Sequence, residues 1–283
     1  MPELPEVQTV VTQLGEKIIG KKITLVWSDW QKKIFPSYSE FLRHAKNASI
    51  VGVRRFGKHI VIDLDNDHSI VAHLKMTGHF LVKNDQNREK PAFTEDPING
   101  YIHHIFTFAD GTTLEFSDMR KFGWLHILET EAVEKLPSIA TLGIDALSPK
   151  LTGQYFHELL VGKKTRPIGV VLLEQGLIAG IGNIYRSEAL FLAGIVPTRR
   201  IDTLTSGEWQ KILPAIKKVL SKAVRLRGTS DGDFRDTDGL QGSFQETLYV
   251  YGRTGEPCKK CGTIIVRQKI GQRSVFYCPQ CQK

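Results

Sequence analysis

The sequence predicts an α+β protein with several domains: an N-terminal helix, an antiparallel β domain, a helical region and a small C-terminal module. Three observations support this order. Apolar residues recur at helical spacing near the start of the chain, short alternating runs follow them, and all four cysteines lie near its end. A chain of 283 residues exceeds the length of one average domain, so we expect two packed domains and the small module.

Residues 6–19 are predicted to form the N-terminal helix. Its apolar residues fall on one face, at i, i+3, i+4, i+7 and i+11; they are Val7, Val10, Val11, Leu14 and Ile18. Pro5 suits the first turn of a helix, and Gly20 is a stop signal. The segment therefore has both the periodicity and the end signals of an amphipathic helix.

The chain from this helix to about residue 130 is predicted to be an antiparallel β domain. Its strand candidates are short apolar or alternating runs, with turn signals such as Asp110-Gly111 between them. They are Ile60–Leu64, Ile70–Met76, Ile105–Phe108 and Thr112–Phe116. Residues 83–99 are polar and contain two prolines, which predicts an exposed loop.

After Pro137 the pattern becomes helical. Predicted helices cover 152–160, 167–175 and 184–192, and a last one runs from a Thr205–Glu208 capping box to about Val224. Within them, Pro167 marks a start, Gly176 an end and Pro214 a kink. Residues 228–245 are rich in Gly, Ser and Asp, so we expect a mobile loop there.

The four cysteines form two C-x2-C pairs separated by sixteen residues: Cys258, Cys261, Cys278 and Cys281. Two such pairs place four thiolates at the tips of two knuckles, which suits one tetrahedral Zn²⁺. A pair of disulfides is the alternative, and a cytosolic chain has little use for disulfides. The set contains no His and no Asp, so we expect a closed, structural zinc site.

The charge favours a polyanionic partner. The net charge is +8, and from Tyr249 to the end seven Lys/Arg face one acid, which is 7 − 1 = +6. Charge alone does not choose between nucleic acid and a membrane surface. No apolar stretch approaches the roughly 20 residues needed to cross a bilayer, and the N-terminus has no basic region followed by an apolar run as in a signal peptide, so we expect a cytosolic protein.

The first six residues, Met-Pro-Glu-Leu-Pro-Glu, contain a candidate nucleophile. Trimming of Met1 exposes the secondary amine of Pro2, and an α-amino group with a pKa near about 8 is partly neutral at physiological pH. Its attack on a sugar C1′ gives an iminium with no N–H to lose. Glu3 alongside can donate and accept protons. The alternative is that Pro and Glu only decorate a helix start.

This opening occurs together with the Ala179–Tyr185 run (AGIGNIY), the segment Arg120–Gly123 (RKFG) and the segment Val250–Cys258 that leads into the cysteine module. In this combination and order, the chain resembles the formamidopyrimidine-DNA glycosylase family over essentially its whole length. The resemblance implies a bifunctional glycosylase and AP lyase of base-excision repair that acts on 8-oxoguanine and ring-opened purines by β,δ-elimination.

The same resemblance implies the domain organisation. Residues 1–136 would form a catalytic β-sandwich domain with its N-terminal helix, and 137–227 a helix–two-turn–helix DNA-binding domain. Residues 228–248 would form a mobile lesion-recognition loop and linker, and 249–283 a zinc-finger β-hairpin. One structural zinc is the implied cofactor.

Catalytic roles are carried over residue by residue. Pro2 matches the Schiff-base nucleophile, Glu3 the proton donor and Glu6 a supporting acid. Lys58 matches the lysine linked to β-elimination and phosphate contact, and Arg273 the arginine linked to δ-elimination. Without the resemblance, Lys58 and Arg273 would be ordinary surface cations.

DNA-contacting roles follow in the same way. Asn183 matches a DNA contact and also suits a helix N-cap after a glycine-rich turn. Met76, Arg120 and Phe122 match the trio that fills the gap left by an extruded base. The alternative for Met76 and Phe122 is core packing.

The chain departs from the family pattern at three places. Met119 replaces a proline, which puts the rigidity of the neighbouring backbone in question. Tyr101 stands where members often have a DNA-contacting His, and His103 is a candidate substitute. Gly169 replaces a lysine that some members place on the oxidised base, which bears on the strength of 8-oxoguanine preference.

The partner implied is double-stranded DNA with oxidised bases or abasic sites, bound by a monomer in the bacterial cytosol, with no membrane. One rival is an endonuclease VIII-type glycosylase for oxidised pyrimidines, whose N-terminus typically has Gly where Leu4 stands here. A rival from another class is a non-catalytic protein that binds damaged DNA. Loss of Pro2 or Glu3 would indicate the latter, and both are present.

Overall fold

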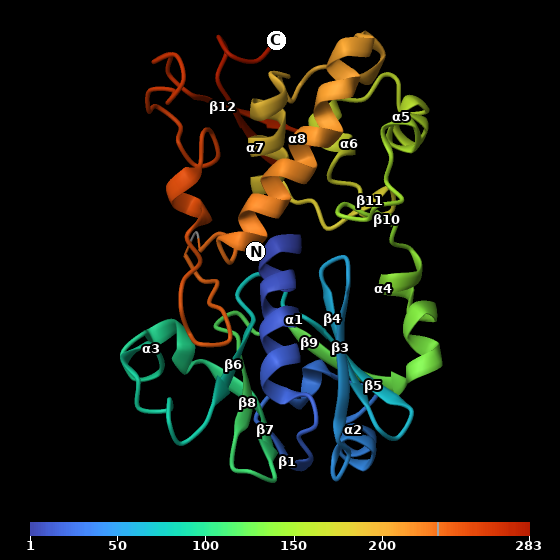
Figure 1. Ribbon diagram of the computed structural model, residues 1–283, viewed down its shortest axis with the longest axis vertical. Helices are drawn as coiled ribbons and strands as arrows, with labels where there is room; N and C mark the ends of the chain where they lie inside the picture. Colours follow the sequence, from blue (N-terminus) through green and yellow to red (C-terminus); the bar gives the residue numbers. More distant parts are fainter. Residues whose placement is uncertain (231) are drawn as a thin grey trace. The chain divides into compact units, whose positions relative to one another are not determined.

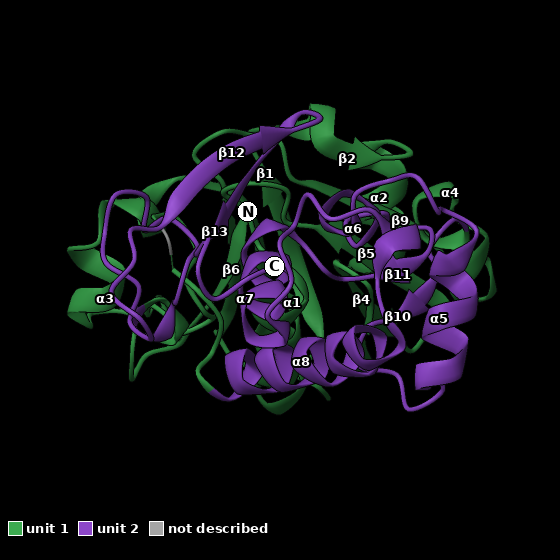
Figure 2. Ribbon diagram, turned by 90° about the horizontal axis from the view of Figure 1, so that it is seen from above, with its two compact units in different colours: residues 1–140, 226–245 green, residues 141–225, 246–283 purple. Residues whose placement is uncertain are grey.

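The computed structural model describes residues 1–230 and 232–283, which form two compact units (Figure 2). Residues 1–140 and 226–245 make up the first unit, and residues 141–225 and 246–283 the second. The segment 226–245 therefore returns to the first unit. Asp231, within the predicted mobile loop, lies outside the described residues.

The first unit begins with helix α1 (Leu4–Ile18), two residues earlier than predicted. Glu3 and Glu6 form a capping box: the Glu3 N–H donates to the Glu6 carboxylate at 2.7 Å. With Pro5 in the first turn, this fixes the start of the helix. The apolar face is fully buried, as predicted, at Val7, Val10, Leu14 and Ile18.

Two sheets follow (Figure 1). In order across the first sheet the strands are β1 (Ile23–Ser28), β7 (Ile102–Phe108), β8 (Thr113–Ser117) and β6 (His79–Lys83). Across the second they are β2 (Ile34–Phe35), β9 (Trp124–Glu129), β5 (His68–His73), β4 (His59–Leu64) and β3 (Ile50–Phe56). All pairings are antiparallel except β2 with β9, which is parallel.

One apolar core joins the two sheets and the helix. It contains Val10 of α1, Ile62 of β4 and Phe106 of β7, each at most 2% exposed. Both sheets contribute buried apolar residues to this one core, as expected of two sheets packed face to face. The predicted β-sandwich preceded by one helix is therefore confirmed.

Two segments differ from the predictions. Helix α2 (Tyr38–Ala45) interrupts the region that was expected to contain only strands, with Ser37 as its N-cap and Phe41 and Ala45 on its buried face. The predicted loop 83–99 contains α3 (Pro91–Thr94) and leads into the 3₁₀ turn η2 (Pro97–Gly100). That loop is not wholly exposed either, since Asn99 is 1% exposed and hydrogen-bonds His79.

The second unit is mainly helical. Its helices are α5 (Gly153–Val161), α6 (Ile168–Val171), α7 (Asn183–Ala193) and α8 (Ser206–Arg225), and its strands are β10 (Ile144–Asp145), β11 (Ile178–Ala179), β12 (Val266–Ile270) and β13 (Arg273–Tyr277). The remaining elements of the chain are α4 (Pro137–Ala140), η1 (Gln31–Lys33), η3 (Thr130–Lys135), η4 (Ile201–Thr203) and η5 (Phe244–Thr247).

The Thr205–Glu208 capping box at the start of α8 is confirmed, because each residue accepts the backbone N–H of the other. The prediction for α6 was too long: the helix ends at Val171, not at residue 175. The Gln175 side chain donates to the carbonyls of Leu173 and Ile181 and accepts the Gly180 N–H. These bonds hold the chain in turns instead of a continued helix.

Candidate active site and nucleic-acid interface

The start of α1 holds three of the predicted site residues, and all three are buried. Pro2 is buried, Glu3 is 2% exposed and Glu6 is 1% exposed. The Glu6 carboxylate accepts the Glu3 N–H through one oxygen and the Thr229 N–H through the other, both at 2.7 Å. The Glu6 side chain thus connects Glu3, which follows the candidate nucleophile Pro2, to the segment 226–245.

Thr229 follows a glycine that the site requires. Gly228 has φ +80°, and a Cβ there would lie 2.5 Å from the Glu6 Oε1 atom. Any larger residue would both strain the backbone and displace Glu6. Thr229 was not predicted from the sequence, because its role depends on a backbone N–H 223 residues away from Glu6.

Lys58 lies in the turn between β3 and β4, and the turn lies beside the start of α1. Arg55 makes the connection: its Nε donates to the Gln8 side chain at 2.8 Å and its Nη1 to the Gly57 carbonyl at 2.9 Å. Gly57 adopts φ +55°, which the tight turn needs. Lys58 is 8% exposed, so it is not the ordinary surface cation that was the alternative.

Met76, Arg120 and Phe122 lie together on the surface. The Arg120 Nη1 atom is 3.2 Å from the Met76 sulfur, and its guanidinium lies 4.8 Å from the Phe122 ring centre. Met76 is 41% exposed and Phe122 is 44% exposed. These exposures contradict core packing, the alternative explanation for Met76 and Phe122.

The turn that carries Arg120 and Phe122 is organised by Asp118, which the sequence analysis missed. Its buried carboxylate accepts the Thr77 hydroxyl, the Arg120 N–H at 3.2 Å and the Gly123 N–H at 2.7 Å. Hydrogen bonds to one carboxylate therefore fix the backbone around Met119. The aspartate two residues before Arg120 was the sequence feature that could have indicated this role.

Tyr101 and His103 differ in accessibility. Tyr101 is 41% exposed, whereas His103 is 8% exposed and its Nδ1 lies 2.9 Å from the Asp29 carboxylate. Contact of His103 with DNA stays a prediction, and in this structure its ring is paired with Asp29. Of these two residues, Tyr101 is the more accessible for contact with DNA.

The described residues of 226–243 contain no helix or strand, as the composition of 228–245 predicts, but they are packed within the first unit. Asp236 and Thr237 are fully buried, and Phe234 joins the main core. The Val82 N–H donates to the Thr237 carbonyl at 2.9 Å, and Gln13 of α1 accepts the Thr237 N–H. Polar composition predicted an irregular segment but not this burial.

In the second unit, Asn183 is the first residue of α7 and half-buried. The N-cap is Gly182, so the prediction of Asn183 as N-cap was wrong by one residue. Its side chain is not used for capping because the Asn183 Oδ1 accepts a hydrogen bond from Arg186 one turn later. The glycine-rich turn before α7 includes Gly180, at φ +103°.

Arg273 is exposed at the start of β13, in the hairpin that β12 and β13 form. Buried side chains attach this module to α7. Glu188 accepts three consecutive backbone N–H groups, from Tyr249, Val250 and Tyr251, at 2.8–2.9 Å. Burial raises the pKa of the Glu188 carboxyl above its usual range, while these hydrogen bonds oppose the rise.

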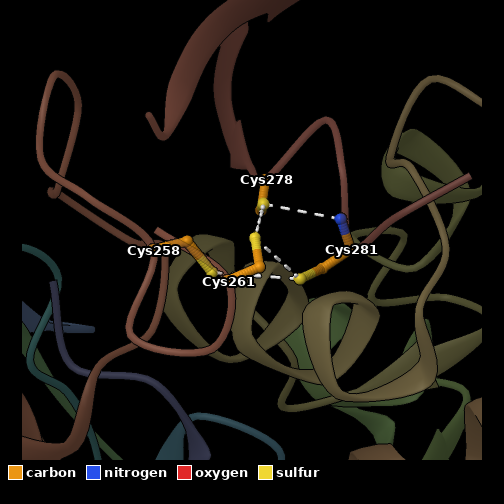
Figure 3. A group of neighbouring side chains, drawn as sticks. All are labelled: Cys258, Cys261, Cys278 and Cys281. Atoms are coloured by element: carbon orange, nitrogen blue, oxygen red, sulfur yellow. Dashed lines mark hydrogen bonds between the residues drawn. The ribbon is translucent and has the colours of Figure 1, made fainter. Parts of the chain in front are cut away.

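The four cysteines converge as predicted (Figure 3). Their sulfurs lie within 4.8 Å of one another, with Cys258–Cys281 at 3.9 Å and Cys261–Cys278 at 3.5 Å. All four are free thiols, which contradicts the disulfide alternative. Sulfurs about 2.3 Å from a tetrahedral Zn²⁺ lie about 3.8 Å apart, so the cluster fits one zinc with no open position.

Comparisons with known proteins agree with this geometry. Residues 1–125 match the model of the formamidopyrimidine-DNA glycosylase N-terminal domain, residues 142–234 its H2TH domain, and residues 255–283 a zinc finger found in FPG and IleRS. Among the described residues, no helix has the length and apolar character needed to cross a membrane.

The relatives span the whole chain. A formamidopyrimidine-DNA glycosylase of Pelotomaculum thermopropionicum is 40% identical, with 100% of this chain and 99% of the relative covered. Two structures of Lactococcus lactis Fpg, one with DNA that contains an abasic site and one with DNA that contains N7-benzyl-Fapy-dG, are each 32% identical with a TM-score of 0.87. The alignments cover 99% and 100% of both chains, respectively. The chain belongs to the formamidopyrimidine-DNA glycosylase family.

Proposed function

We propose that this chain excises oxidised purines, 8-oxoguanine and formamidopyrimidines, from double-stranded DNA and then cuts the strand at the resulting abasic site. The observation that carries the proposal is the buried start of α1, where Pro2, Glu3 and Glu6 lie together. A family member that had become a passive binder of damaged DNA would have no use for a nucleophile and an acid held in this way.

Removal of Met1 creates the nucleophile. The Pro2 amine attacks C1′ of the damaged nucleotide, the C1′–N bond breaks, and Glu3 supplies the proton that balances charge on the departing base and sugar. The C1′–O4′ bond then opens, O4′ takes up the proton that the attacking amine has lost, and the product is an iminium between Pro2 and C1′. Its fixed positive charge accepts the electron pair that develops when a C2′ proton is removed.

Strand cutting follows from this iminium. Loss of the C2′ proton expels the 3′ phosphate (β-elimination), and loss of a later proton from the sugar expels the 5′ phosphate (δ-elimination). We assign Lys58 to the first step and to phosphate contact, and Arg273 to the second. Both roles require a cation that can stabilise a departing phosphate.

The DNA is held by contacts of several kinds. Asn183, at the first turn of α7, contacts a phosphate. Phe122 wedges a base step, Arg120 and Met76 fill the gap that the extruded base leaves, and Tyr101 contacts the strand from its exposed position. We assign recognition of the flipped base to the described residues of the segment 228–248, which are packed into the first unit up to residue 245.

Zinc shapes the hairpin and takes no part in the chemistry. Cys258, Cys261, Cys278 and Cys281 hold one Zn²⁺, which supplies folding energy to a module with little core of its own. We place the enzyme in the bacterial cytosol as a monomer on the nucleoid, with the domain boundaries that the sequence predicts.

The alternative is a preference for oxidised pyrimidines. Leu4, which favours the purine-directed branch, is fully buried as the first residue of α1. A glycine at that position would lose this apolar contact. The purine-directed branch therefore remains our proposal.

Trapping with borohydride tests the mechanism. Reduction of the iminium by borohydride should link the protein to lesion-bearing duplex DNA, and peptide mass mapping should locate the link on Pro2, with Met1 absent. Glu3→Gln keeps the size of the side chain but removes its proton, so base removal should fall at least about 100-fold while cutting at preformed abasic sites is largely kept.

An adduct on an internal lysine such as Lys58, with a free N-terminus, would contradict the Pro2 mechanism and leave the glycosylase assignment standing. Equal loss of both activities in Glu3→Gln would remove its role as the proton donor to the base. Faster excision of oxidised pyrimidines than of 8-oxoguanine would favour the alternative branch.

A further inference from the structure

Arg186 is a charged residue on α7 that no step above has used. Its side chain is fully buried, and it is the largest such side chain among the described residues. The guanidinium donates to oxygens from three separate segments: the Gly169 carbonyl at 2.7 Å, the Asn183 side chain, and the Ser274 carbonyl at 3.0 Å. One rigid group therefore connects α6, the first turn of α7 and the hairpin.

The bond to Asn183 decides how that amide is oriented. A guanidinium has only donors, so the atom that faces it must be the Asn183 Oδ1 acceptor. The Nδ2 amino group, which is the donor end, then points to the other side of the amide. An asparagine that contacts a DNA phosphate must present this donor end, because phosphate oxygens only accept.

The bond to Ser274 fixes the residue next to Arg273. Ser274 and Arg273 are consecutive on β13, and Arg273 pairs with Ile270 across a turn that contains Gly271, at φ +56°. A cavity of about 230 Å³ separates this hairpin tip from α6; its lining residues include Val170, Leu173, Arg186 and Arg273. Since the tip is not packed solidly against α6, the Arg186 hydrogen bonds hold it across that gap.

The acceptor on α6 is itself rigid. A Cβ on Gly169 would lie 2.7 Å from the Pro197 carbonyl oxygen and 2.8 Å from the Pro197 Cβ, so this backbone is in close contact with the loop after α7. The Gly169 N–H also donates to the Pro197 carbonyl at 2.9 Å. Arg186 thus donates to a carbonyl whose position is fixed, and its other hydrogen bonds hold Asn183 and the hairpin tip relative to that carbonyl.

We infer that Arg186 is a positioning residue that sets the Asn183 amide and the Arg273 hairpin tip together, so that phosphate contact and δ-elimination depend on one buried guanidinium. This inference rests on the proposed roles of Asn183 and Arg273. It differs from a purely structural role because the module has separate anchors at its cysteine end. Glu188 holds residues 249–251 there, and Gln282 donates to the Ile195 carbonyl at 2.8 Å.

Arg186→Met tests the inference, because it removes the hydrogen bonds to Gly169, Asn183 and Ser274 and keeps an apolar side chain of similar length. We expect the δ-elimination rate on an abasic duplex to fall about tenfold, the loss expected for a charge-assisted hydrogen bond, while β-elimination and borohydride trapping change much less. Affinity for the abasic duplex should also fall, and metal analysis should still find one zinc per chain. Arg186→Lys, which keeps the charge and some donors, should lie between Arg186→Met and the unaltered protein.

Two further measurements make the test specific. In the Arg273→Ala background, Arg186→Met should add no further loss of δ-product, because Arg186 acts there through Arg273. Arg200→Met is the matched control, since its guanidinium is exposed and paired with Asp202 in the same unit; its β-to-δ ratio should equal that of the unaltered protein.

An unchanged β-to-δ ratio in zinc-loaded Arg186→Met would overturn the inference. If Arg186→Met does not fold, Arg186→Lys decides: loss of zinc or of folding in that variant as well would assign Arg186 a structural role only. Failure of the proposed function is distinguishable, because the unaltered protein would then give no borohydride adduct or no δ-product.

Discussion

At the scale of single residues, one carboxylate connects two parts of the proposed site. Glu6 accepts the N–H groups of Glu3 and Thr229 through its two oxygens. The position of the proposed nucleophile is therefore linked to the segment that we assign to recognition of the flipped base. A carboxylate suits this position because it is acceptor-only, and both groups that face it are donors.

Glu6→Gln should weaken this link without emptying the space. One of its side-chain atoms becomes an amino group that faces a backbone donor, so one hydrogen bond is replaced by a repulsive contact. We expect the rate of iminium formation, measured by single-turnover borohydride trapping on an abasic duplex, to fall about 10- to 100-fold. Glu16→Gln, on the exposed side of the same helix, is the control. Equal trapping rates in the two variants would contradict the positioning role of Glu6.

At the scale of elements, the turn 118–123 presents Arg120 and Phe122 on a backbone that Asp118 fixes. The buried carboxylate binds this turn to Thr77, which follows Met76, so all three surface residues are positioned from one point. Lys121 adopts φ +55°, which the turn imposes on a non-glycine residue. Such local strain persists only where surrounding bonds determine it.

Phe122→Ala should distinguish insertion of the Phe122 ring into the base stack from a role of that ring in packing the protein. Because Phe122 is 44% exposed, the free energy of unfolding should change by no more than about 0.5 kcal/mol. Base excision from a duplex should slow about tenfold or more, since stacking on a base contributes on the order of 1–3 kcal/mol, and cutting at preformed abasic sites should suffer less. Phe35→Ala, at 41% exposure, is the matched control and should leave both rates unchanged. A large loss of stability with normal excision per folded molecule would instead support packing.

At the scale of the whole molecule, buried histidines make the stability of the sandwich depend on pH. Burial lowers the pKa of His59 and of His104 to about 4 each, and both rings lie in the β-sandwich. In the unfolded chain these rings titrate near about 6.5. The folded state therefore binds fewer protons between these values, and its stability is complete above about pH 6.5 and falls as the pH drops toward 4.

His104→Gln should flatten this dependence. The lowering of the His104 pKa from 6.5 to about 4 corresponds to roughly 3 kcal/mol at most in the free energy of unfolding. Urea unfolding should show that the unaltered protein loses this contribution as the pH falls toward 4, and that the variant does not. His157→Gln, which replaces an exposed histidine, should keep the slope of the unaltered protein. Identical slopes in His104→Gln and the unaltered protein would show that His104 is not protonated differently on unfolding.

Much of this protein follows from its sequence, because the signals concerned are local or periodic. The apolar stripe of α1, the strands β4, β5, β7 and β8, the capping box of α8 and the zinc ligands are specified by neighbours a few residues apart, and these predictions are confirmed. Short elements were harder. Helix α2 is only eight residues long, and α6 ends at Val171, before a segment in which the Gln175 side chain donates to the Leu173 carbonyl.

The residues of the site divide in the same way, into those that local motifs indicate and those that only the fold brings together. The motifs indicated Pro2, Glu3, Arg120 and the cysteines, but three hydrogen-bonding centres came only from the tertiary structure: Glu6 with Thr229, Asp118 with Thr77, and Arg186 with Ser274. Their partners are separated by 223, 41 and 88 residues. Such contacts leave no periodicity to detect, because partners so far apart in the chain meet only where the fold brings them together.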